Sequence, residues 1–198
     1  LYDGSPIDDP LGMGQRAVTF LRRLKHPSSP EPNHAFQLFD FQERIVRRVY
    51  GPRNPDGTRQ VKTVFLMLPR GSRKTSIAGA LSLLHLLGPE RVPAGQVIFA
   101  ACDPEQASIG FREAANILRE DKNLMKEVRI RDAFNSKKQI TFLRDNSTLT
   151  ALASDGGRAH GLTPSFTLVD EIHAWKGFDL WDAIKSGQPK VHDPLMVI

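Results

Sequence analysis

The chain has 198 residues, a length that suits one α/β domain with a single buried core. Its one cysteine excludes an internal disulfide framework, and no apolar segment approaches the ~18 residues of a membrane span. The net charge is +5 and the sequence pI is about 9.6. A basic balance favours a polyanionic partner through counterion release, but charge alone leaves DNA binding open, because many basic proteins bind no nucleic acid.

The first 38 residues are predicted to form an arm that precedes the main domain. Proline and polar residues recur along it, and His-Pro-Ser-Ser-Pro-Glu-Pro at 26–32 cannot hold a helix. Only residues 15–24 predict a short helix, because apolar side chains recur on one side of it. We therefore expect an N-terminal arm over 1–38 and one domain over 39–198.

From residue 39 onward, apolar runs typical of buried strands alternate with helical stripes. The expected elements are a helix at 39–50, a strand at 61–68, a helix at 77–87, a strand at 96–102, a helix from 104, a hairpin of 139–143 with 148–152, and strands at 166–169 and 195–198. Buried strands that alternate with helices imply a mainly parallel sheet covered on both faces, the α/β class.

The strongest chemical signal lies in residues 68–75, Leu-Pro-Arg-Gly-Ser-Arg-Lys-Thr. In a P-loop, backbone N–H groups and a helix N-terminus surround phosphate oxygens, a lysine reaches the β- and γ-phosphates, and the next hydroxyl coordinates Mg²⁺. Lys74 and Thr75 stand where these roles require them. The match to the general pattern is imperfect, because Leu68 and Arg73 occupy the two glycine positions. A plain basic loop is the alternative, and the buried strand before the loop and the apolar helix after it favour the P-loop.

Nucleotide binding is assigned to the residues of this loop and of the first helical turn. They are Arg70, Gly71, Ser72, Arg73, Lys74, Thr75 and Ser76. Arg70 is expected to cap the phosphates from the other side and to assist catalysis together with Lys74; a solvated arginine is the alternative.

A second motif, Phe-Thr-Leu-Val-Asp-Glu at 166–171, is acidic and has the Walker B form. In this form a hydrophobic strand places acidic residues at its carboxyl end. Asp170 is predicted to hold Mg²⁺ together with Thr75, and the metal would neutralise charge on the phosphates of ATP. Glu171 is predicted to orient or deprotonate the attacking water as a general base. An Asp-Glu pair after an apolar run is common by chance, but its combination with Lys74 and Thr75 far upstream is not.

Together these motifs resemble the N-terminal ATPase domain of the large terminase subunit of tailed bacteriophages, over roughly residues 38–198. Leu-Phe-Asp-Phe-Gln at 38–42 resembles the family's adenine-binding segment, in which Gln42 would read the adenine edge. The phosphate loop resembles the terminase form, in which an arginine enters early. The most specific likeness is the stretch 154–175, which leads from a Gly-Gly-Arg-Ala-His-Gly loop into the acidic strand and on to Trp175.

The resemblance implies a P-loop NTPase fold of the ASCE type, a three-layer sandwich with a mainly parallel central sheet and an added β-hairpin. It implies that ATP hydrolysis drives double-stranded DNA into a procapsid. The implied assembly is a homo-oligomeric ring, expected to be a pentamer, on the portal protein, with the small terminase subunit as a further partner and no membrane. The implied location is the cytoplasm of the infected bacterial host, transiently at the procapsid portal, and not the mature virion.

Arg158 is the candidate arginine finger that acts on the ATP of a neighbouring subunit. It lies in the glycine-rich loop before the acidic strand, and terminases resemble this in placing a trans-acting arginine a short way before Walker B. A DNA-phosphate contact or a solvated loop arginine is the alternative, and Arg70 acting within its own subunit is a rival finger.

Two features depart from the family pattern. Arg73 replaces the glycine before the P-loop lysine, so its side chain must find room beside the phosphates, which predicts weaker nucleotide binding or an altered loop geometry. The chain also ends at Ile198, before the expected coupling motif and nuclease domain. Nuclease activity is therefore expected only from the full-length protein.

Two other functions share part of the pattern. A helicase-type DNA-dependent ATPase has the same aromatic-Gln, P-loop and Asp-Glu motifs, and strand-separation assays would distinguish it. A DNA-binding module with a vestigial P-loop would explain Arg73, and a nucleotide-dependent thermal shift would count against it.

Overall fold

The structure is a computed structural model and describes residues 4–133, 138–154 and 161–198. Its helices are α1 (Met13–Arg23), α2 (Asp40–Tyr50), α3 (Lys74–Leu86), α4 (Pro104–Arg119), α5 (Lys122–Glu127) and α6 (Asp179–Gly187), with 3₁₀ turns at Pro32–His34, Ile172–Ala174 and Gln188–Lys190. Its strands are β1 (Thr63–Val64), β2 (Gln96–Ala101), β3 (Val128–Arg131), β4 (Gln139–Phe142), β5 (Thr148–Ala153), β6 (Pro164–Val169) and β7 (Leu195–Val197).

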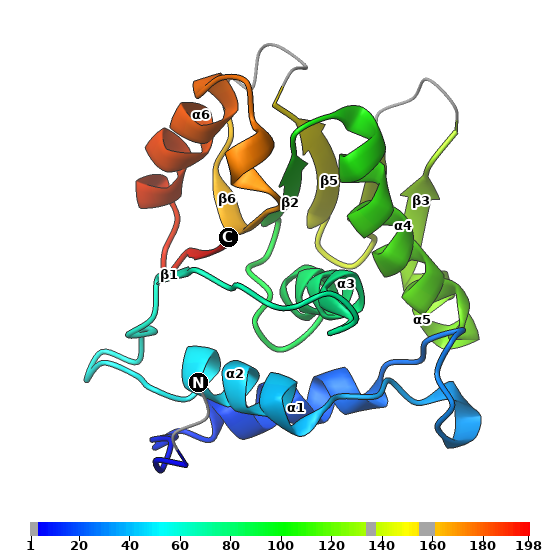
Figure 1. Ribbon diagram of the computed structural model, residues 1–198, viewed down its shortest axis with the longest axis vertical. Helices are drawn as coiled ribbons and strands as arrows, with labels where there is room; N and C mark the ends of the chain where they lie inside the picture. The colour runs from blue at the N-terminus through cyan, green and yellow to red at the C-terminus, as the bar shows by residue number, and fades with distance from the viewer. Residues whose placement is uncertain (1–3, 134–137, 155–160) are drawn as a thin grey trace.

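In the described part of the chain these strands form one seven-stranded sheet in the order β1-β7-β6-β2-β5-β4-β3. The strands β1, β7, β6, β2 and β5 pair in parallel. The strands β4 and β3 are added at one edge by antiparallel pairing (Figure 1). The mixed, mostly parallel sheet with an antiparallel hairpin confirms the predicted fold class.

Helices cover both faces of this sheet. Successive side chains of a strand point to opposite faces, so each strand contributes to the cores on both sides. In β2, Val97 and Phe99 lie in the larger core, which the sheet shares with α3 and α4. Ile98 and Ala100 lie in a smaller core, which the opposite face shares with α6. The result is three layers, helix, sheet and helix (Figure 1).

Most predicted elements occur within one or two residues of the expected bounds, and the expected hairpin is β4 with β5. The helix predicted at 77–87 begins three residues earlier, at Lys74. The strand predicted at 61–68 differs most, since only Thr63–Val64 is regular strand. β1 is an edge strand that pairs on one side only, with β7. Beyond β1, one further hydrogen bond links the two segments, from the N–H of Leu66 to the carbonyl of Ile198. The chain then leads into the phosphate loop. The short elements α5, β3 and α6 were not predicted.

The N-terminal arm packs into the same core as the rest of the chain. Ala17, Val18 and Leu21 of α1 are buried, and α1 lies against α2 and α3 (Figure 1). A bridge between Lys25 and Ala35 closes the segment after α1 into a loop. No helix in the ranges described is long and apolar enough to cross a membrane. A division of the chain at residue 38 stays a prediction.

A buried histidine lies between α3 and the sheet. His85 is 2% exposed, its Nε2 lies 2.9 Å from the hydroxyl of Tyr50, and its ring stacks on Phe166 of β6 at 4.2 Å. Burial lowers the pKa of His85 well below its usual value, and the positive charge of Arg59 acts in the same direction. His85 is therefore neutral in the folded protein at neutral pH.

We expect the free energy of unfolding to fall as the pH drops below about 6.5, because only the unfolded state then binds a proton at His85. The slope from this group is at most about 1.4 kcal/mol per pH unit. Denaturant titrations at several pH values measure it. His85→Gln, which keeps a partner for Tyr50, should flatten the dependence, whereas His192→Gln at an exposed site should not. Equal slopes in the wild type and His85→Gln would show that His85 does not carry the effect.

Candidate nucleotide-binding site

The phosphate loop is a tight turn between β1 and α3. Gly71 has φ 82°, in the left-handed region that glycine adopts without a steric penalty. Arg73, with φ 54° and ψ 38°, takes the same region immediately before α3 starts at Lys74. The first turn of α3 contains no acidic residue, and no side chain among the residues described caps it, an arrangement that suits an anion.

The loop meets the acidic strand end at a direct contact. Lys74 Nζ donates to Asp170 Oδ1 at 2.8 Å, across 96 residues of sequence. The side chains are 43% and 24% exposed, so the pair contributes little to stability. The contact does show that the lysine of the phosphate loop lies beside the carboxylate that follows β6.

Hydrogen bonds fix the corner at Asp170 and Glu171. The N–H of Asp170 donates to the carbonyl of Ala100 at 2.8 Å, and the indole Nε1 of Trp175 donates to the carbonyl of Asp170 at 3.1 Å. Glu171 is exposed and has φ 47° and ψ 48°. Such a left-handed conformation is costly for a residue with a Cβ and is concentrated at functional sites. Trp175 thus supports the acidic corner.

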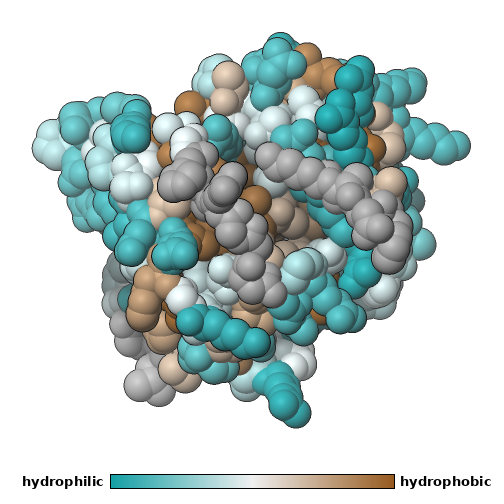
Figure 2. Space-filling view, turned by 90° about the horizontal axis from the view of Figure 1, so that it is seen from above, coloured by the Kyte–Doolittle hydropathy of each residue, from teal (hydrophilic) through white to brown (hydrophobic). Residues whose placement is uncertain are grey.

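A cleft of about 240 Å³ joins these groups at the carboxyl edge of the sheet. Its polar lining residues are Lys74, Thr75, Asp170, Glu171 and His173. Its other side is apolar and includes Phe65 and Met67, which are 69% and 81% exposed. Figure 2 looks down on this edge and shows apolar surface near its middle, between hydrophilic residues.

The donors of the cleft fit Mg²⁺. Thr75 supplies a hydroxyl and Asp170 a carboxylate, both lining the same cleft, and Mg²⁺ prefers oxygen ligands and keeps several waters. An oxygen pair beside a phosphate cradle is the arrangement in which one or two protein ligands and the substrate phosphates share the metal. The two predicted metal ligands therefore line one cleft, and their binding of Mg²⁺ stays a prediction.

Gln42 holds the phosphate loop. It is 2% exposed, its Nε2 donates to the carbonyl of Ser72 at 2.9 Å, and its Oε1 accepts from the N–H of Phe39 at 3.1 Å. Its amide thus joins the start of α2 to the loop. A role in reading adenine stays a prediction.

The other predicted loop residues point in several directions. Arg70 is exposed in the turn, and the hydroxyl of Ser72 is buried without a hydrogen-bond partner among the residues described. The guanidinium of Arg73 lies over the ring of Phe39, 5.5 Å from its centroid. Arg158, the predicted finger, lies outside the described residues.

The hydroxyl of Ser76 is bound by a residue outside the phosphate loop. This hydroxyl donates to Glu113 Oε1 of α4 at 2.5 Å, and the same carboxylate oxygen lies 2.7 Å from Nε2 of His26 in the arm. The Nδ1 of His26 accepts from the N–H of Ser28, so its Nε2 carries the proton toward Glu113. Nothing in the sequence pattern indicated Glu113 or His26, because the partners come from three distant segments.

We expect Ser76→Ala to leave nucleotide affinity within about twofold of the wild type, because its hydroxyl is already engaged by Glu113. The lost hydrogen bond should lower the free energy of unfolding by about 1 kcal/mol. Calorimetry with a non-hydrolysable ATP analogue and denaturant unfolding measure the two quantities. A loss of affinity of tenfold or more would show that the Ser76 hydroxyl binds nucleotide, and Thr75→Ala is the matched comparison that should lose affinity in the presence of Mg²⁺.

Comparison with known proteins agrees with this geometry. The family model "Terminase large subunit, ATPase domain" matches residues 40–198. The large terminase subunit of Enterobacteria phage HK97 is 30% identical over 188 residues, which cover 93% of this chain and 36% of that protein. The crystal structure of the HK97 large terminase superposes with a TM-score of 0.79 at 30% identity, again over 93% of this chain and 36% of that one.

A more distant structure supports the fold alone. The ATPase domain of the large terminase of Thermus phage P74-26 has a TM-score of 0.53 at 16% identity, over 81% of this chain and 69% of that one. The family model covers well over half of the chain, and the motifs that it spans are those that form the cleft. The chain therefore belongs to the family of terminase large subunit ATPase domains.

Proposed function

We propose that this chain binds ATP with Mg²⁺ at the cleft and that the full-length protein uses ATP hydrolysis to move double-stranded DNA into a procapsid. The observation that supports the proposal is the contact between Lys74 and Asp170, which brings the phosphate loop and the acidic end of β6 together at the carboxyl edge of the sheet. The chain spans 36% of its HK97 relative, so the activity of the whole protein is part of the proposal.

Each of the predicted site residues has a distinct task in this proposal. Lys74 exchanges its partner Asp170 for the β- and γ-phosphates, which releases the carboxylate toward the metal position. Thr75 and Asp170 hold Mg²⁺, which neutralises charge on the phosphates when bound. Glu171 orients the attacking water and accepts its proton. Arg70, exposed at the edge of the turn, reaches the phosphates from the solvent side.

The proposed partners follow from family membership and charge. The net charge of +5 favours a polyanion, and double-stranded DNA is the proposed one. The proposed assembly is a ring of identical subunits, five in number, docked on the portal protein, with the small terminase subunit as a partner. Its proposed place is the cytoplasm of the infected host and, during packaging, the procapsid portal.

ATP hydrolysis and DNA packaging by the full-length protein test the proposal. ATPase activity that requires Mg²⁺ and DNA uptake by purified procapsids are the expected results. Strand separation in place of uptake would instead indicate a helicase. A protein that shows neither a nucleotide-dependent thermal shift nor turnover would indicate a vestigial P-loop.

We further propose that Arg158 acts on the ATP of the neighbouring subunit, and mixing two inactive variants tests this. In rings that contain both Arg158→Ala and Glu171→Gln subunits, some interfaces pair an intact Glu171 with an intact Arg158. ATPase activity should then partly return, because a guanidinium supplied in trans stabilises charge on the transferring phosphoryl group. No recovery at any mixing ratio, in rings shown to exchange subunits, would contradict the trans role.

A further inference from the structure

The side chain of Arg73 leaves the phosphate loop and lies against the start of α2. Its guanidinium carbon is 5.5 Å from the centroid of the Phe39 ring, within the range of a cation–π contact. Phe39 in turn stacks on Phe41, with ring centroids 6.0 Å apart and planes inclined by 9°. The three side chains form a continuous group that joins the loop to the aromatic segment.

A second link lies directly beside the first. The amide of Gln42 donates to the carbonyl of Ser72, the residue before Arg73, and accepts from the N–H of Phe39. Two consecutive loop residues, Ser72 and Arg73, are therefore tied to one segment, the first by the buried amide of Gln42 and the second by the ring of Phe39. These two residues directly precede α3.

The backbone explains why an arginine needs this contact. Arg73 has φ 54° and ψ 38°, a conformation that glycine adopts without penalty and that a residue with a Cβ adopts only when other contacts compensate. The stack on Phe39 is such a contact. It also holds the guanidinium over the ring of Phe39, so that an arginine is accommodated where a P-loop ordinarily has glycine.

We propose that Arg73 is a positioning residue that clamps the phosphate loop to Phe39 and so preorganises the site for nucleotide. The proposal rests on the proposed nucleotide binding and deepens it. A loop already held in its binding conformation loses less freedom when the ligand arrives, and the gain appears as affinity. Arg73 acts through the loop and Phe39, so its removal should weaken the binding of ATP and of ADP to the same extent.

A double-mutant cycle in the full-length protein tests the clamp. Affinities for ADP and for a non-hydrolysable ATP analogue, both with Mg²⁺, are measured for the wild type, Arg73→Ala, Phe39→Leu and the double variant. Each single change should weaken both nucleotides by about fivefold, and the double variant should be no weaker than either single one, since both remove the same contact. Arg73→Gln, which keeps a planar group without the charge, should recover part of the affinity.

The matched control is a second cycle between Arg70 and Phe39. Arg70 is an exposed arginine of the same loop, and its effect should multiply with that of Phe39→Leu. If the losses of affinity in Arg73→Ala and Phe39→Leu multiplied in the double variant, the clamp would be overturned. A loss of affinity confined to the ATP analogue would also overturn it, because it would place Arg73 on the γ-phosphate. Absence of nucleotide binding in the wild type would instead refute the proposed function, so the two failures are distinguishable.

Discussion

Glu171→Gln should leave nucleotide bound but lower ATP turnover by about 10²-fold or more, because the amide keeps the shape of the side chain and loses the general base. Glu171 is exposed at the cleft in a left-handed conformation, beside the carboxylate that contacts Lys74. Steady-state ATPase rates and nucleotide affinities of the full-length protein measure the two effects separately.

Lys74→Ala is the matched contrast. It removes the charge that would meet the β- and γ-phosphates, so nucleotide affinity itself should fall, and turnover should fall with it. Asp170 also loses its partner. Because the two side chains of that pair are partly exposed, the folded state should lose little stability. If both variants lost binding to the same extent, the separation of binding from chemistry between Lys74 and Glu171 would be wrong.

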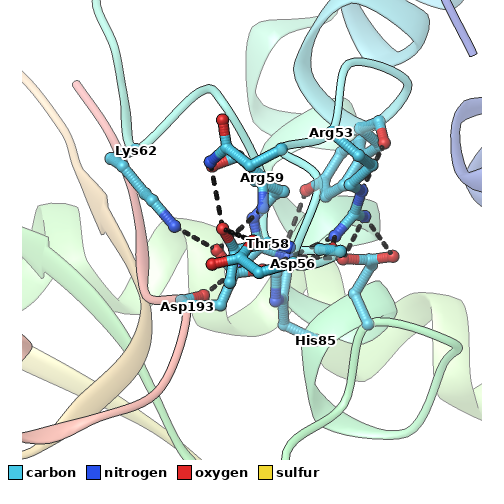
Figure 3. Close-up of polar contacts among 11 residues, drawn as sticks. Arg53, Asp56, Thr58, Arg59, Lys62, His85 and Asp193 are labelled. Carbon is cyan, nitrogen blue, oxygen red and sulfur yellow. Dashed lines mark hydrogen bonds and ion pairs between the residues drawn. The ribbon is translucent and has the colours of Figure 1, made fainter.

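Removal of Glu90 should destabilise the fold more than any other single change that the structure suggests. Arg53 Nη2 lies 3.3 Å from both carboxylate oxygens of Glu90, and Arg59 Nη1 donates to the same carboxylate. The side chains of all three residues are at most 5% exposed. Asp193 and Lys62 extend this network to the residues before β7 and β1 (Figure 3).

Glu90→Ala leaves two buried guanidinium groups without their shared carboxylate, and we expect a loss of about 3 to 5 kcal/mol in the free energy of unfolding. Denaturant titration measures it, and Glu31→Ala, at an exposed site in the arm, is the control that should change little. Added salt should not reproduce the loss, because buried pairs are poorly screened. A change below about 1 kcal/mol would mean that Asp193 alone compensates the arginines.

The sequence alone determined the features that local patterns encode. Apolar periodicity placed α2, α3, α4 and the strands β2, β5 and β6, since the side chains of buried helices and strands repeat with different periods. Fixed spacings identified Lys74 with Thr75 and Asp170 with Glu171, because P-loop chemistry needs those groups at those positions. The short elements β3 and α5 escaped prediction, because a few residues carry too little periodicity.

Only the tertiary structure decided where side chains point and which distant segments meet. The contact of Lys74 with Asp170, the stack of Arg73 on Phe39 and the capture of Ser76 by Glu113 all join residues far apart in the chain. The direction of a side chain depends on the partners that folding brings to it, and no local pattern encodes those partners. For that reason the sequence left weaker nucleotide binding and an altered loop geometry open at Arg73, and only the folded chain shows its guanidinium over the ring of Phe39.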